Sequence, residues 1–227
     1  RFDADVERFS NLDTGQSATM DAPLALELVA QAAAASNPHA RDLLDIGCGA
    51  GNYALRLLGL LPGMNVTLLD LSGPMLTRAA QRVGAATPGA VRTVQADIRE
   101  VGFAPASFDL ITAAAVFHHL RDDAQWHAVF GKCYAALRPG GTLWISDLVT
   151  HDLPAVQAVM WRRYGEYLVG LGGTAYRDRV FAYIELEDSP RSVGFQIDCL
   201  RAAGFAAVDV LHKHGCMATF AAFKADA

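Results

Sequence analysis

The run Asp45-Ile46-Gly47-Cys48-Gly49-Ala50-Gly51 constrains the fold of this chain more than any other part of the sequence. It follows a short apolar segment and opens a helical pattern over residues 53–61. Alternate glycines let the backbone turn sharply and leave no Cβ in the path of a ligand. The first turn of the following helix offers N–H groups that have no partner within the helix. The run therefore predicts a strand, a ligand-binding turn and a helix in that order.

Strand patterns alternate with helix patterns through the middle of the chain. Helical patterns cover residues 72–83 and 123–137, and the apolar runs that favour strands are residues 42–46, 66–71, 91–96, 108–114 and 142–148. This alternation predicts an α/β protein with a Rossmann-like, doubly wound and mostly parallel sheet. Two more strand patterns, residues 206–212 and 217–224, flank a tight turn and predict an antiparallel pair at the sheet edge.

The other segments predict a helical cap over this core. Residues 24–35 and 153–171 have helical patterns, the second ending at Gly172-Gly173, while residues 174–192 favour an irregular segment and residues 192–203 a helix. We therefore expect four parts, which are an N-terminal cap segment over 1–40, a ligand-binding core over 41–150, a helical lid insert over 151–191, and a C-terminal helix and strand pair over 192–227 that completes the core.

Length, charge and cysteine usage argue against several classes of protein. A chain of 227 residues fits one α/β domain with a small appendage. Its net charge of −5 and its lack of basic runs argue against an extended nucleic-acid interface. No apolar run is long enough to cross a bilayer, and nothing resembles a signal peptide, although the chain begins at Arg1 and its true start is open. The four cysteines are too widely spaced for a zinc motif or a disulfide framework, which favours the reducing cytoplasm.

Two carboxylates follow later strands and point to an adenosine-type ligand. Asp70 closes the second strand, 19 residues after Gly51, where an acid can accept hydrogen bonds from both hydroxyls of a ribose. Asp97 follows the third strand, where it could accept the adenine amino group with Ile98 against the ring. Each acid also has an ordinary interpretation, as a helix cap or a solvated turn.

The charge of the glycine turn then distinguishes between two nucleoside ligands. A dinucleotide site prefers a third glycine one position later, where this chain has Asn52, and the turn has no Arg or Lys to meet a pyrophosphate. Asp45 would repel a phosphate and attract a cation. S-adenosylmethionine (SAM) has no phosphate and carries a sulfonium and an ammonium group. In a partly dry cleft this attraction is worth about a few kcal/mol, and its sign favours SAM over NAD.

The ordered motifs resemble those of the class I SAM-dependent methyltransferase family. The match covers residues 41–150 and consists of Leu43 to Gly51, Leu68-Leu69-Asp70-Leu71-Ser72, Gln95-Ala96-Asp97-Ile98, Phe108-Asp109-Leu110-Ile111, Phe117-His118-His119-Leu120 and Leu137 to Leu143. Residues 200–205 are similar to the family's junction between its last helix and sixth strand.

The resemblance implies seven strands with the last antiparallel, SAM as cofactor with S-adenosylhomocysteine as product, and no metal. It implies Asp45 near the methionine end, Asp70 at the ribose, Asp97 and Met75 at the adenine, and Ala114 beside the methionine moiety. The full expected cofactor-binding set is Asp45, Gly47, Cys48, Gly49, Gly51, Asp70, Leu71, Met75, Asp97, Ile98, Ala114 and His119.

Two alternatives to methyl transfer stay open at this point. The opening Phe2-Asp3-x-x-Val6 is similar to carboxy-SAM synthases, which modify SAM itself, although no counterpart of that group's central insert is evident. A SAM-binding module without catalysis is the other alternative, and an acceptor cavity beside the sulfonium would argue against it.

Catalytic candidates are few, because methyl transfer depends mainly on alignment and needs a base only when the acceptor must lose a proton. His118 and His119 follow the fourth strand, at the edge where open α/β sheets bind ligands. We interpret His118 as structural and His119 as either a base or a structural residue. Tyr164, in an aromatic run with Trp161 and Tyr167, is a second candidate within a lid, with simple packing as its alternative. We expect a small-molecule acceptor and no membrane partner, and we leave the oligomeric state open, a homodimer included.

Overall fold

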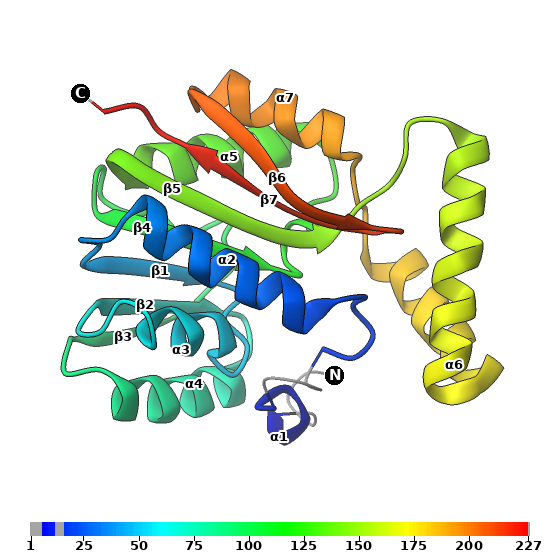
Figure 1. The fold of residues 1–227 in the computed structure, drawn as a ribbon, viewed down its shortest axis with the longest axis horizontal. Helices are drawn as coiled ribbons and strands as arrows, with labels where there is room; N and C mark the ends of the chain where they lie inside the picture. The colour runs from blue at the N-terminus through cyan, green and yellow to red at the C-terminus, as the bar shows by residue number, and fades with distance from the viewer. Residues whose placement is uncertain (1–5, 12–15, 227) are drawn as a thin grey trace.

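The computed structural model describes residues 6–11 and 16–226 and contains a seven-stranded sheet in the order β3-β2-β1-β4-β5-β7-β6 (Figure 1). All neighbouring strands are parallel except β7, which runs antiparallel to β5 and β6. The strands are β1 (Asp42–Ile46), β2 (Asn65–Asp70), β3 (Val91–Gln95), β4 (Phe108–Ala114), β5 (Leu137–Leu148), β6 (Ala207–His214) and β7 (Met217–Phe223). The predicted doubly wound sheet with one antiparallel strand is confirmed.

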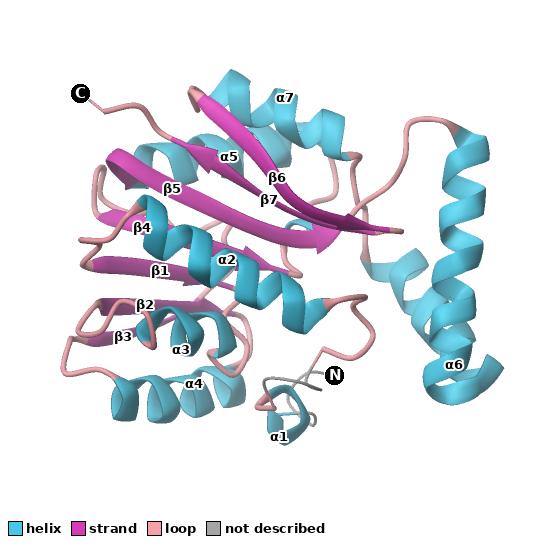
Figure 2. Ribbon diagram, in the orientation of Figure 1, coloured by secondary structure: helices cyan, strands magenta, loops and turns pink. Residues whose placement is uncertain are grey.

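Helices cover both faces of the sheet, which is why its central strands are apolar on both sides (Figure 2). One face carries α2 (Ala22–Ser36), α3 (Asn52–Leu58) and α4 (Gly73–Ala86), which pack on it through Val29, Leu57 and Val83 among others. The other face carries α5 (Asp123–Ala136) and α7 (Val193–Ala203), packed around Trp126, Phe130 and Phe220. The 3₁₀ turn η2 (Phe117–His119) follows β4, and the four-residue α1 (Val6–Phe9) lies against α4.

Several helix ends carry the residue that physical chemistry favours there. The Ser72 hydroxyl accepts from the Met75 N–H at the start of α4, and Asp122 and Ser192 act in the same way at α5 and α7. The helix α7 ends at Gly204, which is left-handed with φ 110°. These local signals explain why most predicted boundaries lie within a few residues of the observed ones.

The helix α6 (Pro154–Glu187) stands beyond the carboxyl ends of the strands and reverses direction inside its length (Figure 1). The reversal occurs at Gly172 and Gly173, where φ and ψ leave the helical region and Gly173 has φ 78°. The expectation of an irregular segment over residues 174–192 is wrong for residues 174–187, which form the returning helical arm. That arm is held by tertiary packing, because the Phe181 ring stacks on Trp161 with centroids 4.5 Å apart.

The N-terminal residues divide between two places in the fold. The helix α2 belongs to the helical layer on the sheet, where Val29, Ala30 and Ala33 are buried. The segment 16–21 instead crosses toward α6, and Met20 packs in a cluster with Tyr164 and Leu168. Of the expected cap over residues 1–40, therefore, this short segment is the described part that lies next to α6.

Candidate functional site

A cavity of about 530 Å³ opens where the carboxyl ends of the parallel strands meet. Residues at the carboxyl ends of β1, β2, β4 and β5 and in the loops after β1, β2, β3 and β4 line one side of it, and residues of α6 and of the segment 16–19 line the other. This is the edge at which open α/β sheets bind ligands, and the volume lies within the range of small-molecule sites. Its apolar wall with a few converging polar groups is therefore the candidate site.

The glycine turn and Asp70 are joined directly. Asp70 Oδ2 accepts from the Gly49 N–H at 2.8 Å, and Asp70 Oδ1 accepts from the Ser72 N–H at 2.8 Å. Gly49 has φ +50°, and a Cβ built on it meets nothing within 4 Å, so the turn has open space on its cavity side. Gly47, with φ +61°, leaves no room, because a Cβ there would meet the Val116 side chain. The turn thus forms a backbone cradle that leads into the cavity.

Gly51 and Cys48 lie in the same turn but contact protein instead of the main cavity. A Cβ on Gly51 would come within 3.0 Å of Val83, so this glycine lets α3 and α4 approach each other. Cys48 is buried and lines a second, small cavity together with Asp45, and burial raises the pKa of its thiol. Such a thiol stays protonated at neutral pH, which fits a packing residue better than a nucleophile.

Asp45 is a buried carboxylate with one satisfied and one unsatisfied oxygen. Its Oδ1 accepts from the Thr112 hydroxyl at 2.7 Å, and these residues are register partners on β1 and β4. Its Oδ2 makes no aligned hydrogen bond among the described residues, although the nearby Ala54 backbone N–H acts to lower the pKa of the carboxyl. Burial raises the pKa of Asp45 to about 7, and the Thr112 hydrogen bond opposes that rise. An unsatisfied buried carboxylate oxygen next to an open glycine cradle fits a ligand with a positively charged group.

The residues expected at the adenine end line the same cavity. Leu71, Met75, Asp97 and Ile98 all line the cavity, with Met75 and Ile98 buried and Leu71 exposed. Asp97 holds the Arg99 side chain through an ion pair of 2.6 Å. Hydrogen bonds from Arg99 hold the pKa of Asp97 below its ordinary value, so the carboxylate is ionised at neutral pH. Sequence reasoning did not anticipate this partner.

Ala114 lines the cavity at the end of β4, and the backbone beside it is unusual. Ala115 has φ 56°, in the left-handed region that favours glycine, and its N–H donates to the Ser146 carbonyl at 2.8 Å. This bend turns the chain sharply into η2, which carries His118 and His119. Non-glycine residues in such a conformation are often found at functional sites.

His118 is buried and held by a carboxylate. Its Nδ1 pairs with Asp147 Oδ1, its backbone N–H donates to Asp147 Oδ2 at 3.1 Å, and its Nε2 lies 3.8 Å from Asp188 Oδ2. Burial alone would lower the pKa of His118, but the charges of Asp147 and Asp188 and the hydrogen bond to Asp147 outweigh it and raise the pKa. Two carboxylates thus hold His118 in place while it also lines the cavity, and its structural role stays a prediction.

His119 is more accessible and faces a second carboxylate. Its Nδ1 lies 2.9 Å from Asp188 Oδ1, and its side chain is 38% exposed whereas that of Asp188 is 3% exposed. The contact is not aligned as a hydrogen bond, and Asp188 Oδ1 has no hydrogen-bond partner among the described residues. Both residues line the cavity, so this pair borders the space in which a molecule could bind.

His118, His119 and Asp188 could together approach a metal ion, since their ligand atoms lie within 4.8 Å of one another. Metal binding requires neutral imidazoles. The charges of Asp147 and Asp188 raise the pKa of His118, so an ion bound here would have to displace a proton that the imidazole holds more tightly than an ordinary histidine does.

Aromatic side chains of α6 form the wall opposite the sheet. Tyr164, Tyr176 and Tyr183 line the cavity with Val180 and Ile184. The Tyr164 hydroxyl donates to the Ala18 carbonyl at 3.0 Å, and burial raises the pKa of Tyr164. The Tyr167 hydroxyl donates to the Ser17 carbonyl at 2.8 Å. These two bonds fasten the segment 16–21 to α6.

Sequence reasoning missed both carboxylates beside His118 and His119. Asp147 lies near the carboxyl end of β5, the strand next to β4, and the convergence of parallel strand ends could have identified it. Asp188 lies in the segment expected to be irregular, and only the reversal of α6 brings it to His119. The Phe2-Asp3 part of the opening motif lies outside the described residues.

The sheet order, the glycine cradle and the acids at the strand ends together define a class I SAM-dependent methyltransferase fold. A family model described as a methyltransferase domain matches residues 43–141. The carboxy-S-adenosyl-L-methionine synthase of Chromohalobacter salexigens is 31% identical over 189 residues, covering 79% of this chain and 67% of that protein. The chain belongs to the class I SAM-dependent methyltransferase family.

Other comparisons agree on the fold. An uncharacterized methyltransferase of Mycobacterium bovis is 33% identical over 119 residues, which cover 52% of this chain and 55% of that protein. The chain thus spans little more than half the length of this relative. The YcgJ protein of Bacillus subtilis has a solved structure with a TM-score of 0.64 at 16% identity, covering 90% of this chain and 99% of that one. Among the described residues, no helix combines the length and the apolar character that a membrane span requires.

Proposed function

We propose that this protein transfers the methyl group of SAM to a small molecule that binds between His119, Asp188 and the aromatic wall of α6. One observation carries the proposal. A single cavity runs from the glycine cradle and Asp70 to His119 and Asp188, so the space for the cofactor continues into space for an acceptor. A SAM-binding module without catalysis would not need this second region.

The residues at the cofactor end fit SAM. Asp70 would hold the ribose, Asp97 with Met75 and Ile98 the adenine, and Gly49 with Ala114 the path of the methionine moiety. Asp45 supplies negative charge, and its unsatisfied buried oxygen is the observation that favours a cationic ligand. When bound, SAM supplies an electrophilic methyl group on a sulfonium that is a good leaving group.

At the acceptor end, His119 serves as the proton acceptor. Its imidazole would accept the proton of an acceptor hydroxyl, which would make that oxygen a better nucleophile toward the electrophilic methyl group that SAM would supply. Asp188 stabilises the imidazolium that forms, through its otherwise unsatisfied Oδ1. Tyr164 acts as a positioning residue, because its hydroxyl is already donated to Ala18.

The aromatic wall and the acids favour an acceptor with an apolar or aromatic body and no negative charge. Apart from the histidines, the cationic side chains among the described lining residues are Arg99 and Arg121. Each of these two arginines is paired with a carboxylate. Asp147, Glu187 and Asp188 would repel an anionic acceptor. We therefore infer a neutral phenol or enol as the acceptor class.

The similarity to carboxy-SAM synthase makes modification of SAM itself the second candidate. That product carries an added carboxylate on the transferred carbon, and a site for it would need a cation near the sulfonium. The pairing of Arg99 with Asp97 and of Arg121 with Glu187 disfavours this candidate.

Two measurements test the proposal. Isothermal titration with SAM, S-adenosylhomocysteine and NAD should show binding of the first two, and binding of NAD without SAM would overturn the proposal. Mass spectrometry of the ligand that copurifies, followed by detection of S-adenosylhomocysteine formed with a panel of phenols, should show unmodified cofactor and turnover. A copurified carboxylated SAM would instead establish the second candidate.

A further inference from the structure

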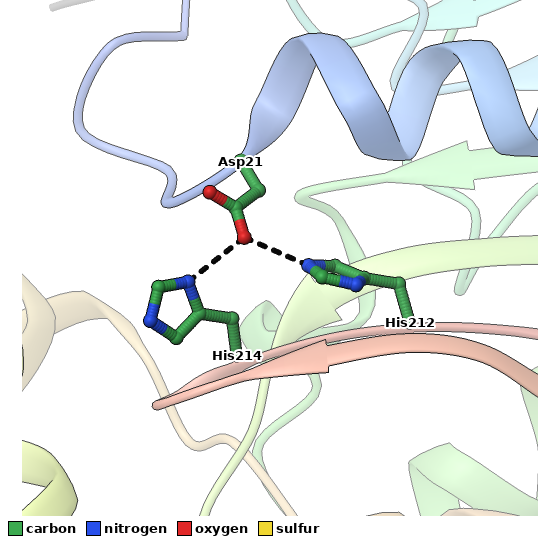
Figure 3. Close-up of side chains that lie close together, drawn as sticks. All are labelled: Asp21, His212 and His214. Carbon is green, nitrogen blue, oxygen red and sulfur yellow. Dashed lines mark hydrogen bonds and ion pairs between the residues drawn. The ribbon is translucent and has the colours of Figure 1, made fainter.

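Three side chains from distant parts of the chain meet outside the main cavity (Figure 3). Asp21 precedes α2, and its Oδ2 lies 2.8 Å from His212 Nε2 and 2.8 Å from His214 Nδ1. The ligand atoms of the three residues all lie within 4.8 Å of one another. None of the three lines the main cavity, so the methyl-transfer proposal does not use them.

The backbone brings these side chains together by two local features. His212 and His214 alternate along β6, so their imidazoles leave the same face of the strand. The register shifts between Val210 and His212, an irregularity of the kind that re-aims strand side chains. Lys213 leaves the other face, and its Nζ bonds the Gly215 carbonyl and His151 Nε2, so its positive charge lies away from the cluster.

Asp21 adopts a conformation that serves this cluster instead of its own helix. It occupies the N-cap position of α2 with φ 56°, and its side chain makes no capping hydrogen bond. An aspartate at this position normally accepts from the first turn of the helix. Here its carboxylate reaches to β6 instead, where both imidazoles share one oxygen.

We propose that Asp21, His212 and His214 bind a divalent transition-metal ion, with Zn²⁺ as the best match. Two imidazole nitrogens and one carboxylate oxygen are ligands that Zn²⁺ prefers, whereas Mg²⁺ and Ca²⁺ prefer oxygen alone. Ligands at zinc distances from one ion are separated by about 3.4 Å in a tetrahedral site. A small outward move of the carboxylate from its present hydrogen bonds therefore makes room for the ion.

The cluster is accessible and carries the right charge. The side chains are 36%, 23% and 43% exposed for Asp21, His212 and His214, so an ion and one water can reach them. Asp21 supplies a carboxylate oxygen between the two imidazoles, so the cluster offers an anionic ligand beside two neutral ones.

A bound ion would fasten the segment 16–21 to the edge strand β6. That segment lines the cofactor cavity through Gln16, Ala18 and Thr19, and α6 holds it from the other side through Tyr164 and Tyr167. The ion would thus stabilise one wall of the cavity without contacting a ligand inside it. Its role is structural, and the inference stands whether or not the proposed acceptor class is correct.

The test uses the full chain freed of metal by a chelator. Isothermal titration with Zn²⁺ measures stoichiometry, and the visible absorption of Co²⁺ as a probe reports nitrogen and oxygen ligands. The test variant is His212→Ala with His214→Ala. The matched control is His39→Ala, which removes an exposed histidine after α2. A second control, His119→Ala, removes the histidine of the candidate active site, so that Zn²⁺ bound there does not contribute to the measured stoichiometry.

We expect wild type, His39→Ala and His119→Ala to bind one equivalent of Zn²⁺ at this site with equal affinity. The double variant should lose that equivalent, and Asp21→Asn, which keeps the shape of the side chain, should weaken it by about 10- to 100-fold. Zn²⁺ should raise the melting temperature of the wild type and not of the double variant. Equal stoichiometry in the double variant and wild type, or no bound equivalent in the wild type, would overturn the proposal. If the double variant does not fold, Asp21→Asn decides by the same two readouts.

Discussion

His119 Nδ1 and Asp188 Oδ1 lie 2.9 Å apart, although one residue ends the turn after β4 and the other follows the last turn of α6. The pair therefore joins the sheet edge to the helix that covers it. The carboxylate oxygen is buried and makes no aligned hydrogen bond among the described residues, so its negative charge would stabilise the neighbouring imidazole in a protonated form. This relationship places the candidate proton acceptor at the point where the cavity is bounded by both elements.

Replacing His119 should slow the chemical step and leave cofactor binding intact. His119→Gln keeps polarity but cannot take the proton of the acceptor, so we expect kcat to fall by about 10²- to 10⁴-fold. The dissociation constant of SAM, measured by isothermal titration, should change less than threefold. The matched control is His39→Gln, which should behave as wild type. An unchanged kcat in His119→Gln would remove this residue from the mechanism.

Tyr164 and His119 can be separated by the same assay. Tyr164→Phe removes the hydroxyl that donates to Ala18 and keeps the ring in the aromatic wall. We expect a loss of about 1 kcal/mol in the free energy of unfolding and a kcat close to wild type. Tyr167→Phe, which loses the equivalent bond to Ser17, is the matched variant. A 100-fold fall of kcat in Tyr164→Phe alone would instead make its hydroxyl a catalytic group.

The pair of His118 and Asp147 should make stability depend on pH. The pKa of His118 is raised in the folded protein, so the pair contributes its full stabilisation to the fold at a pH below the ordinary histidine pKa of about 6.5. This contribution is lost as the pH rises through the pKa of His118 in the folded protein. Asp147→Asn should therefore cost about 3–5 kcal/mol near pH 6 and less at alkaline pH. Denaturant unfolding of both proteins between pH 5.5 and 9.5 measures the difference. Asp198→Asn, at an exposed ion pair, should show no such trend.

The contacts of the candidate cofactor site could be predicted from the sequence where they form between neighbouring strand ends. Asp70 and Gly49 meet because β1 and β2 are parallel neighbours, which the alternating pattern already implies. Asp45 could be predicted as a site residue because it lies directly before the glycine turn. That one of its oxygens makes no aligned hydrogen bond depends on packing that no sequence pattern reveals.

The acceptor end could not be predicted in the same way. Asp188 reaches His119 only because α6 reverses at Gly172-Gly173 and its second arm packs through Phe181 on Trp161. Asp21 contacts His212, which lies 191 positions later in the chain. This contact depends on the left-handed backbone of Asp21 and on the register shift that precedes His212 in β6. Such contacts come from tertiary packing, which a periodic pattern does not encode.

Gly49 and Gly63 allow a matched test of the glycine cradle. Both have positive φ, and a Cβ at either position meets nothing within 4 Å, but Gly49 alone lines the cavity. Alanine at either position should lower the free energy of unfolding by a similar amount, about 1–2 kcal/mol, because a residue with a Cβ is strained in the left-handed region. Only Gly49→Ala should also weaken SAM binding, by about tenfold or more, because its methyl group occupies the ligand side of the turn. Equal SAM affinity in the two variants would show that the cofactor does not approach this backbone.

Asp45 should couple SAM binding to proton release. Burial raises the pKa of this carboxyl to about 7, so the protein without ligand holds a proton there at pH 6. A nearby cationic group favours the carboxylate and lowers the pKa, so binding of SAM should release a proton below pH 7. Affinity should accordingly rise with pH up to about 7 and then level off.

Isothermal titration at pH 6 in buffers of different ionisation enthalpy measures that proton directly. Asp45→Asn should bind SAM without releasing it, and should bind about 10- to 100-fold more weakly than wild type at pH 8, in line with a charge interaction of a few kcal/mol. Adenosine, which has no cationic group, should release no proton from either protein. In the protein without ligand, the Asp45 carboxyl lowers the free energy of unfolding as pH rises from its ordinary pKa of 3.8 to its folded pKa of about 7. Asp45→Asn should therefore be more stable than wild type at pH 8 and should lose that advantage toward pH 4. Proton release that persists in Asp45→Asn would mean that another group senses the charge of the cofactor.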